Sequence, residues 1–193
     1  QNQPSIGHWN LWTWLNNLIP LAKPEHKEHF KQDLATCLEK FEPTFLEHYG
    51  QGLCQKMGLP HFHKDSLDCS FAFLRILQTE QLDYTQSFIR LQNKEYKTLR
   101  DDCLDLRQFD AFLHQYQEIR KTQDRDELDR VMQSANPHYI LRNHMAQKAI
   151  ELAERGDFSE VERLFKLLNQ PYLKQPDLET EQDTAPLPSD VPE

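Results

Sequence analysis

The chain has 193 residues, enough for one domain with a hydrophobic core, and a net charge of −9. Six acidic residues and no Lys or Arg lie between Pro176 and Glu193, so residues 1–175 hold 25 acidic against 22 basic side chains. This nearly neutral body has no basic stripe for nucleic acid, and only 5 Gly leave little material for a phosphate-binding loop.

The cysteines and the apolar runs indicate a cytoplasmic protein that does not enter a membrane. None of the four cysteines belongs to a Cys-x-x-Cys pair, and free thiols are typical of a reducing compartment. The richest apolar run, residues 9–22, is interrupted by Asn and Pro and is shorter than the ~20 residues of a membrane-spanning helix. No signal peptide is indicated. The chain begins with Gln1 and not with Met, and we expect it to continue a longer polypeptide.

The first sixty residues have helical periodicity. A first helix that Pro20 ends is predicted by apolar residues on one face, namely Trp9, Trp12, Leu15 and Ile19. A second helix is predicted to open at Pro24, because a proline in the first turn costs no hydrogen bond. Its apolar spacing continues to Gly58, but Pro43 is expected to kink or split it, since the proline ring clashes with a carbonyl one turn back.

Further helices are predicted between residues 65 and 135. Their apolar faces are Leu67, Phe71, Leu74 and Leu77; Tyr84, Phe88 and Leu91; Phe109, Phe112, Leu113, Tyr116 and Ile119; and Leu128, Val131 and Met132. Asp65 or Ser66 can cap the first helix, and Asp83 with Gln86 has the capping-box spacing for the second. Residues 93–107 are polar and are expected to be partly irregular.

The last two predicted helices form an αα-hairpin. We expect Asn136 to cap the first helix, Pro137 to occupy its first turn and Gly156 to end it. Asp157 with Glu160 has capping-box spacing for the second helix. The apolar stripes are Leu141, Met145, Ala149 and Ala153 on the first helix, and Phe158, Val161, Phe165 and Leu168 on the second. The predicted fold class is therefore all-α, with residues 1–172 helical and residues 173–193 an acidic, Pro-rich, disordered tail.

Residues that could carry chemistry are few. His61 and His63, with Asp65 nearby, can contact a metal, but the spacings typical of zinc sites are absent and a solvated loop is the alternative. The sequence has no Gly-rich phosphate loop, no Gly-x-Ser-x-Gly and no His-Glu-x-x-His. We therefore assign no catalytic, cofactor-binding or metal-binding residue.

Other polar and aromatic candidates have structural interpretations as well. His144 is expected to be a packed, hydrogen-bonded histidine and not a general base. Arg142, beside Asn143, is expected to bridge to a carboxylate or carbonyl, with a ligand contact as the alternative. A core or domain-docking role is favoured over ligand binding for Trp9, Trp12 and Trp14. A solvated helix face is favoured for the charged residues Glu42, Glu47 and His48.

Several segments follow one another in the order of a known family. They are Asn2-Gln3-Pro4, Trp9-Asn10-Leu11, Asp83-Tyr84-Thr85, the stretch from Asn136 and Pro137 through Leu141, Arg142 and Asn143, then Ala146-Gln147, Gly156-Asp157 and Pro171-Tyr172. Over residues 1–172 this combination resembles the C-terminal region of the selenoprotein O family (SelO, also called YdiU). The structural signature consists of Asn136, Pro137, Leu141, Arg142, Asn143, Gln147, Gly156 and Asp157.

The resemblance implies a protein-kinase-like (pseudokinase) fold that binds ATP and Mg²⁺ and transfers AMP to Ser, Thr or Tyr of protein substrates. The family's nucleotide-binding and catalytic residues lie upstream of the Asn-Gln-Pro segment. The resemblance therefore implies that this chain is the helical C-terminal portion of an adenylyltransferase, inactive alone, with the upstream kinase-like lobes as its partner. A free-standing helical interaction module from a split or truncated gene is the alternative.

Two departures from the family pattern stand out. Family members often end in a redox cysteine or selenocysteine motif, whereas no Cys follows Cys103 here, so thiol regulation through the C-terminus is in doubt. Ile89 also stands where an arginine is common, and the contact of that arginine is either lost or supplied by Arg90.

Overall fold

A computed structural model describes residues 3–60, 64–121 and 124–185, and every regular element in these ranges is a helix. The all-α class is therefore confirmed. The chain divides into two compact units, residues 1–51 and residues 52–193. Within the described ranges, no helix combines the length and apolar character needed to cross a membrane.

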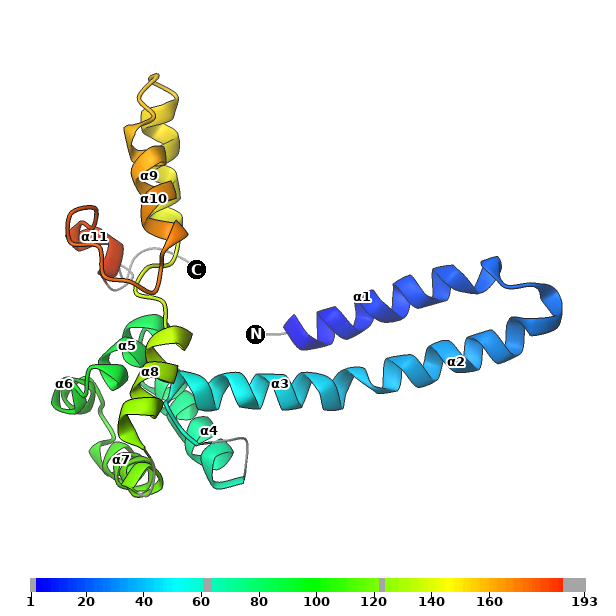
Figure 1. The fold of residues 1–193 in the computed structure, drawn as a ribbon, viewed down its shortest axis with the longest axis horizontal. Coiled ribbons are helices and arrows are strands. Elements are labelled where there is room, and N and C mark those ends of the chain that lie inside the picture. Colours follow the sequence, from blue (N-terminus) through cyan, green and yellow to red (C-terminus); the bar gives the residue numbers. More distant parts are fainter. Residues whose placement is uncertain (1–2, 61–63, 122–123, 186–193) are drawn as a thin grey trace. The chain divides into compact units, whose positions relative to one another are not determined.

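The first unit is a pair of long helices followed by most of a third. Its elements are α1 (Gln3–Leu18), the 3₁₀ turns η1 (Ile19–Leu21) and η2 (Pro24–His26), α2 (Lys27–Glu39) and α3 (Phe41–Lys56), whose last turns belong to the second unit. α1 packs against α2 (Figure 1). Pro20 lies in the turn that ends α1, and Pro24 opens η2, as predicted.

Pro43 explains the break between α2 and α3. α2 ends at Glu39, and Pro43 lies in the first turn of α3, where its missing N–H costs no hydrogen bond. A continuous helix would place the proline ring against the carbonyl of residue 39, so the chain restarts at Phe41 instead. The predicted split of this helix is confirmed.

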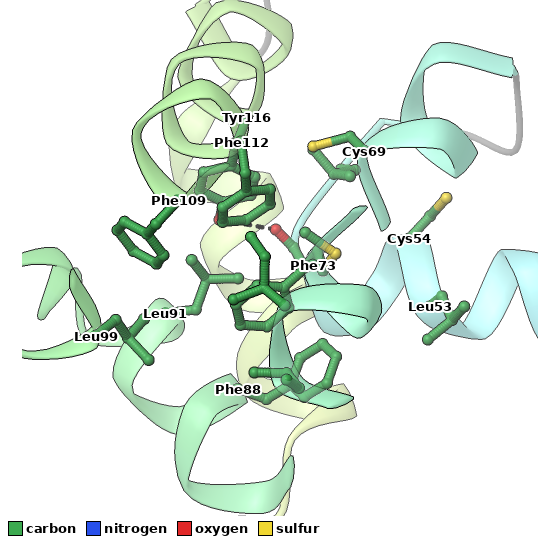
Figure 2. Packing of buried hydrophobic residues seen from close by; sticks show 14 of the residues in the cluster. Leu53, Cys54, Cys69, Phe73, Phe88, Leu91, Leu99, Phe109, Phe112 and Tyr116 are labelled. Atoms are coloured by element: carbon green, nitrogen blue, oxygen red, sulfur yellow. Dashed lines mark hydrogen bonds between the residues drawn. The ribbon is translucent and has the colours of Figure 1, made fainter. Parts of the chain in front are cut away.

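The larger core of the second unit lies among α4 (Lys64–Thr79), α5 (Tyr84–Gln92), α6 (Tyr96–Asp101), α7 (Leu106–Lys121), α8 (Arg125–Ala135) and the end of α3. Figure 2 shows Phe73, Phe112 and Tyr116 gathered in this core. The ring of Phe112 stacks on that of Phe73 with 4.9 Å between centroids and on that of Tyr116 with 5.8 Å. Phe88 meets the edge of Phe73 at 5.3 Å. Such offset and edge-to-face pairs add to the burial of apolar area in holding the helices together.

One boundary in this core differs from the sequence-based expectation. α4 begins at Lys64, before the expected caps Asp65 and Ser66. Residues 93–107 are partly irregular, as expected, since residues 93–95 and 102–105 are non-helical, but they also contain α6, whose Leu99 is fully buried in the core. Tyr96 and Leu99 of this six-residue helix pack on the core, and two positions give too little periodicity to predict a helix.

A smaller core lies between α9 (Asn143–Ala153) and α10 (Ser159–Asn169), which pack side by side (Figure 1). Its buried residues are Tyr139, Met145, Ala149, Leu164 and Leu167. The prediction that Asn136 caps the first of these helices and that Pro137 lies in its first turn is wrong. Asn136 ends α8, and α9 begins only at Asn143, so residues 137–142 form a non-helical connection. Leu141 therefore lies outside the helix and is exposed.

The entry to α10 also differs from the prediction. Gly156 ends the preceding turn with a positive φ of 83°, as expected of a glycine after a helix. The capping box of Asp157 with Glu160 does not form, since Asp157 accepts from the amide of Ser159 at 2.9 Å and Phe158 occupies the N-cap position. The carboxylate of Glu160 binds Arg163 and Lys148 instead.

The acidic segment after α10 was expected to be disordered from residue 173. In the structure, residues 173–185 include α11 (Glu181–Thr184), which has a complete capping box between Thr180 and Asp183. Asp183 is buried and ion-paired with Arg163. The remaining residues of this segment, 186–193, lie outside the described residues.

Candidate functional site

The family-like segment 136–142 meets α3 and α5 in a polar junction, and Asn136 lies at its centre. The buried side-chain amide of Asn136 donates from Nδ2 to the carbonyl oxygen of Lys56 at 2.7 Å and to Oε1 of Gln92 at 3.3 Å. Its Oδ1 accepts from Nζ of Lys56 at 3.2 Å. One side chain thus joins the end of α3, the end of α5 and the end of α8, and it satisfies polar groups that burial would otherwise leave without partners.

Lys56 is held in this junction without a carboxylate partner among the interactions of the described residues. Its ammonium group lies 5.6 Å from the centroid of the Tyr84 ring and 5.2 Å from that of Phe88, close enough for cation–π attraction. Burial lowers the pKa of Lys56, because the charged form loses hydration. The amide of Asn136 and the two aromatic faces replace part of that hydration.

Arg142 and Asp83 form the second part of the junction. Nη1 of Arg142 donates to Oδ2 of Asp83 at 2.7 Å, and both side chains are largely buried. Asp83 also caps α5, because its Oδ1 accepts from the backbone N–H of Gln86 at 2.8 Å. The expected bridge from Arg142 to a carboxylate is confirmed, whereas Nε of Arg142 is buried and has no hydrogen-bond partner among the described residues.

The electrostatics of Asp83 follow from two opposing causes. Burial raises the pKa of its carboxyl, but the hydrogen bond from Arg142, the backbone N–H of Gln86 and the positive charge of Arg142 together lower it below its ordinary value. Asp83 is therefore ionised at neutral pH and acts as an anchor. A general base needs a pKa near the working pH, so this carboxylate is unsuited to that role.

The other signature residues do not join this junction. Pro137 is partly buried in the connection after α8, and Asn143 is exposed in the first turn of α9. Gln147 donates to the carboxylate of Glu151 at 3.0 Å on the outer face of α9. Gly156 and Asp157 lie at the far end of the helix pair. The signature therefore marks one polar junction and one helix turn, and it does not converge on a single pocket.

The remaining chemical candidates have structural surroundings. His61 and His63 lie outside the described residues, and Asp65 is exposed. The described part of the chain holds no group of three His, Cys, Asp or Glu side chains that could bind a metal ion. Nε2 of His144 lies 3.4 Å from the carbonyl oxygen of Gln182, and its Nδ1 is buried with no hydrogen-bond partner in the described part of the chain.

The charged group on α3 and the tryptophans of α1 lie at the surface of the first unit. Glu42, Glu47 and His48 are exposed, as expected of a solvated helix face. All three tryptophans, at positions 9, 12 and 14, are also exposed, so the first unit by itself does not give them the core role that the sequence favours. Trp12 lines a groove between α1 and α2 together with Leu15, Ile19, Leu34 and Leu38.

One buried polar cluster was not identified from the sequence. The hydroxyl of Tyr116 donates to the carbonyl oxygen of Met57 at 2.9 Å, and Nη1 of Arg120 donates to that hydroxyl at 2.7 Å. Nη2 of Arg120 pairs with Asp129, which also binds Lys94. The spacing of four between Tyr116 and Arg120 places both on one helix face, and an arginine on an otherwise aromatic face was the available signal.

Comparison with known proteins now bears on this arrangement. The model of a family described as "Protein adenylyltransferase SelO" matches residues 1–169. The chain belongs to the SelO family. A relative named protein nucleotidyltransferase YdiU, from Pectobacterium atrosepticum, is 36% identical over 195 residues, which cover 98% of this chain and 38% of the relative. Proteins of the same name from Pseudomonas fluorescens and Salmonella schwarzengrund are each 34% identical, covering 96% and 91% of this chain.

The SelO match covers both units of the fold and ends at the last residue of α10. The chain spans about 38% of the length of the Pectobacterium and Pseudomonas relatives and 36% of the Salmonella relative. The polar junction around Asn136 and Arg142 thus lies within the part of the chain that the family shares.

Proposed function

We propose that this chain is the helical C-terminal portion of a SelO-type protein adenylyltransferase with a kinase-like fold. The complete protein would transfer AMP from ATP, with Mg²⁺, to Ser, Thr or Tyr side chains of protein substrates in the cytoplasm. The observation that carries this proposal is the SelO match over residues 1–169. The relatives' name, protein nucleotidyltransferase, and the free cysteines of this chain support it.

The chemistry would come from residues that this chain does not contain. The described residues supply no Mg²⁺ site, because the most buried carboxylates are each engaged by an arginine: Asp83 by Arg142, and Glu160 and Asp183 by Arg163. The sequence also lacks a Gly-rich phosphate loop. We therefore expect this chain to be inactive alone.

The role proposed for this chain is to extend and support the kinase-like lobes of the same protein. The surface that fits this role is that of α1, where Trp9, Trp12 and Trp14 are 59%, 50% and 59% exposed. Neither α1 nor α2 has a buried residue. Covering large apolar side chains contributes roughly 2 kcal/mol each, so these helices favour a docked state.

A nucleotide titration tests the proposal directly. The purified chain is titrated with ATP in the presence of Mg²⁺ and followed by calorimetry, and no binding in the micromolar range is expected. Micromolar binding by this chain alone would overturn the assignment of nucleotide binding to other parts of the protein. A chain extended by the residues that precede Gln1 in the reading frame provides the positive comparison, and it should bind.

The exposed tryptophans also favour a second candidate, a free-standing module that binds a partner protein. The coding sequence upstream of Gln1 distinguishes the two. An in-frame continuation with a kinase-like Gly-rich loop and metal-binding Asp and Asn supports the first proposal, and an adjacent start codon supports the second. Under both proposals the isolated chain should associate or bind an apolar dye, and a dye-silent monomer in size-exclusion chromatography would contradict both.

A further inference from the structure

The acidic segment of residues 173–185, here called the strap, follows α10 and lies against the helix pair α9–α10. Most of its side chains are exposed, but Asp183 is only 2% exposed. Burial of a carboxylate is costly unless it is paired and hydrogen-bonded. The strap therefore has a specific place on the helix pair, although its composition is that of a disordered segment.

Arg163 provides a two-point binding site for Asp183. Nη1 of Arg163 donates to Oδ2 of Asp183 at 2.7 Å, and Nη2 donates to Oδ1 at 3.0 Å. Glu160, one turn before Arg163, accepts from Nε and Nη2 at 2.9 Å each, so the guanidinium is oriented by its own helix. Nη1 also donates to the carbonyl oxygen of Leu178 at 2.8 Å. This planar fork is the geometry in which arginine recognises carboxylates most specifically.

Tyr139 holds the strap at a second point. Its buried hydroxyl donates to a carboxylate oxygen of Glu179 and accepts from the backbone N–H of Gln175 at 2.9 Å. The side chain of Gln175 in turn donates to the carbonyl oxygens of Leu167 at 2.8 Å and Gln170 at 3.0 Å. These carbonyls belong to the last turn of α10 and to the residue that follows it, so the strap also satisfies acceptors that a helix end leaves open.

The strap packs against the small core between α9 and α10. Among the described residues, five buried apolar side chains form this core, and Leu178 of the strap packs against them. Without the strap, the core would lose the contact of Leu178, and the hydroxyl of Tyr139 would lose Glu179 and Gln175. The strap thus contributes Leu178 to the apolar core and Asp183 to the ion pair with Arg163.

We propose that residues 173–185 are a releasable strap, in which an acidic segment of the chain occupies the carboxylate-binding site of Arg163 and seals the core between α9 and α10. The strap is attached by side-chain anchors and not by a continuous packed helix, so it can open while the larger core of the second unit stays folded. Opening uncovers an apolar surface beside a vacated arginine. The match to the SelO model ends at residue 169, before the strap.

Hydrogen exchange on the full chain tests the proposal with a matched pair of variants. Asp183→Ala removes the buried anchor, whereas Glu181→Ala removes an exposed carboxylate of the same short helix. In Asp183→Ala we expect the amides of residues 173–185 to exchange on the order of tenfold to a hundredfold faster, with faster exchange also in α10. Glu181→Ala should exchange like the unmodified chain.

Ionic strength and the remaining amides supply the second readout. Because the anchors are ionic, strap exchange in the unmodified chain should rise between about 0.1 M and about 1 M NaCl, and this rise should be absent in Asp183→Ala. α4 and α7 should keep their protection in both variants, which excludes global unfolding. The proposal would be overturned if the strap amides exchanged at equal rates in Asp183→Ala and Glu181→Ala. It would also be overturned if the amides of α10 kept their exchange rates when the strap opens.

Discussion

Arg142 lies 59 residues after Asp83 in the sequence, yet Nη1 of Arg142 donates to Oδ2 of Asp83 at 2.7 Å. The pair connects the start of α9 to the start of α5, and with Asn136 it fixes the smaller core of the second unit to the larger one. Since Asp83 also caps α5, one carboxylate has two separable tasks: charge neutralisation and capping.

The two tasks of Asp83 can be separated by substitution. Asp83→Asn keeps a capping oxygen but leaves the buried Arg142 without a counter-charge, and we expect a loss of about 3 kcal/mol in the free energy of unfolding. Asp83→Ala also removes the cap and should cost about 1 kcal/mol more. Far-UV circular dichroism in urea provides the measurement, because all three tryptophans lie in α1 and report only the first unit.

Asp65→Asn is the control for this series, since Asp65 is an exposed carboxylate in the first turn of α4. Its effect should stay within about 0.5 kcal/mol. If Asp83→Asn behaved like Asp65→Asn, the buried ion pair would not connect the two cores as we describe.

Substitution by alanine should change the free energy of unfolding differently at three glycines of the second unit. Gly58 has a φ of 56°, and a Cβ there would lie 2.6 Å from Nη1 of Arg120 and 3.0 Å from the carbonyl oxygen of Leu128. Left-handed strain of about 1–2 kcal/mol therefore adds to a collision with the Tyr116–Arg120 cluster. Gly156→Ala meets open space at a φ of 83° and should cost the strain alone.

Gly52→Ala completes the comparison, because this glycine lies inside α3 with nothing within 4 Å of an added Cβ. Alanine should stabilise the helix by about 1 kcal/mol at this position. In urea unfolding, the free energy of unfolding should thus be lower for Gly58→Ala than for Gly156→Ala. That of Gly52→Ala should be higher than that of the unmodified chain. If Gly58→Ala left the free energy of unfolding unchanged, the side chain of Arg120 could move away from the added methyl group at little cost.

Local sequence patterns predicted most helices correctly because they depend on apolar spacing and on proline. The splits at Pro20, Pro24 and Pro43 needed no knowledge of the fold. The error at Asn136 has a different origin. Asn followed by Pro is a good helix start, but here the amide is used by Lys56, 80 residues earlier, and the connection stays extended. No local pattern contains that partner.

Apolar spacing also failed to show which face of α10 is buried. Phe158, Val161 and Phe165 repeat helically, yet all three are exposed, while Leu164 and Leu167 face the smaller core. Glu160 lies on the buried face because Arg163 and Lys148 neutralise it. The composition of the strap likewise predicts disorder, because its order depends on an ion pair with Arg163 that no local pattern shows.

The ion pairs predict a loss of stability in acid. For Asp183, burial raises the pKa, but the hydrogen bonds from Arg163 and Thr180 lower it below the usual 3.8. For Glu160, the hydrogen bond from Arg163 is the largest cause of a pKa below the usual 4.5. Groups with a lowered folded-state pKa contribute full stability above the unfolded-state pKa, and this contribution is lost as the pH falls through the folded-state pKa.

The free energy of unfolding of the second unit should therefore decline from about pH 4.5 downwards and continue to fall below pH 3.8. Urea titrations at several pH values, followed by circular dichroism, measure this decline. Asp183→Asn should flatten the part of the curve below pH 3.8, since it removes one of the titrating groups. An unchanged slope in that variant would contradict the buried pairing of Asp183 with Arg163.

The four thiols should differ in reactivity according to burial. Cys37 is exposed on α2, whereas Cys54, Cys69 and Cys103 are buried. Burial raises the pKa of Cys69 to about 12 and that of Cys103 to about 11, so their reactive thiolate forms are scarce near pH 8. Ellman's reagent should therefore modify one thiol rapidly in the folded chain and the other three only in urea. Cys37→Ser should abolish the rapid phase, and its persistence would show that the core of the second unit is open to the reagent.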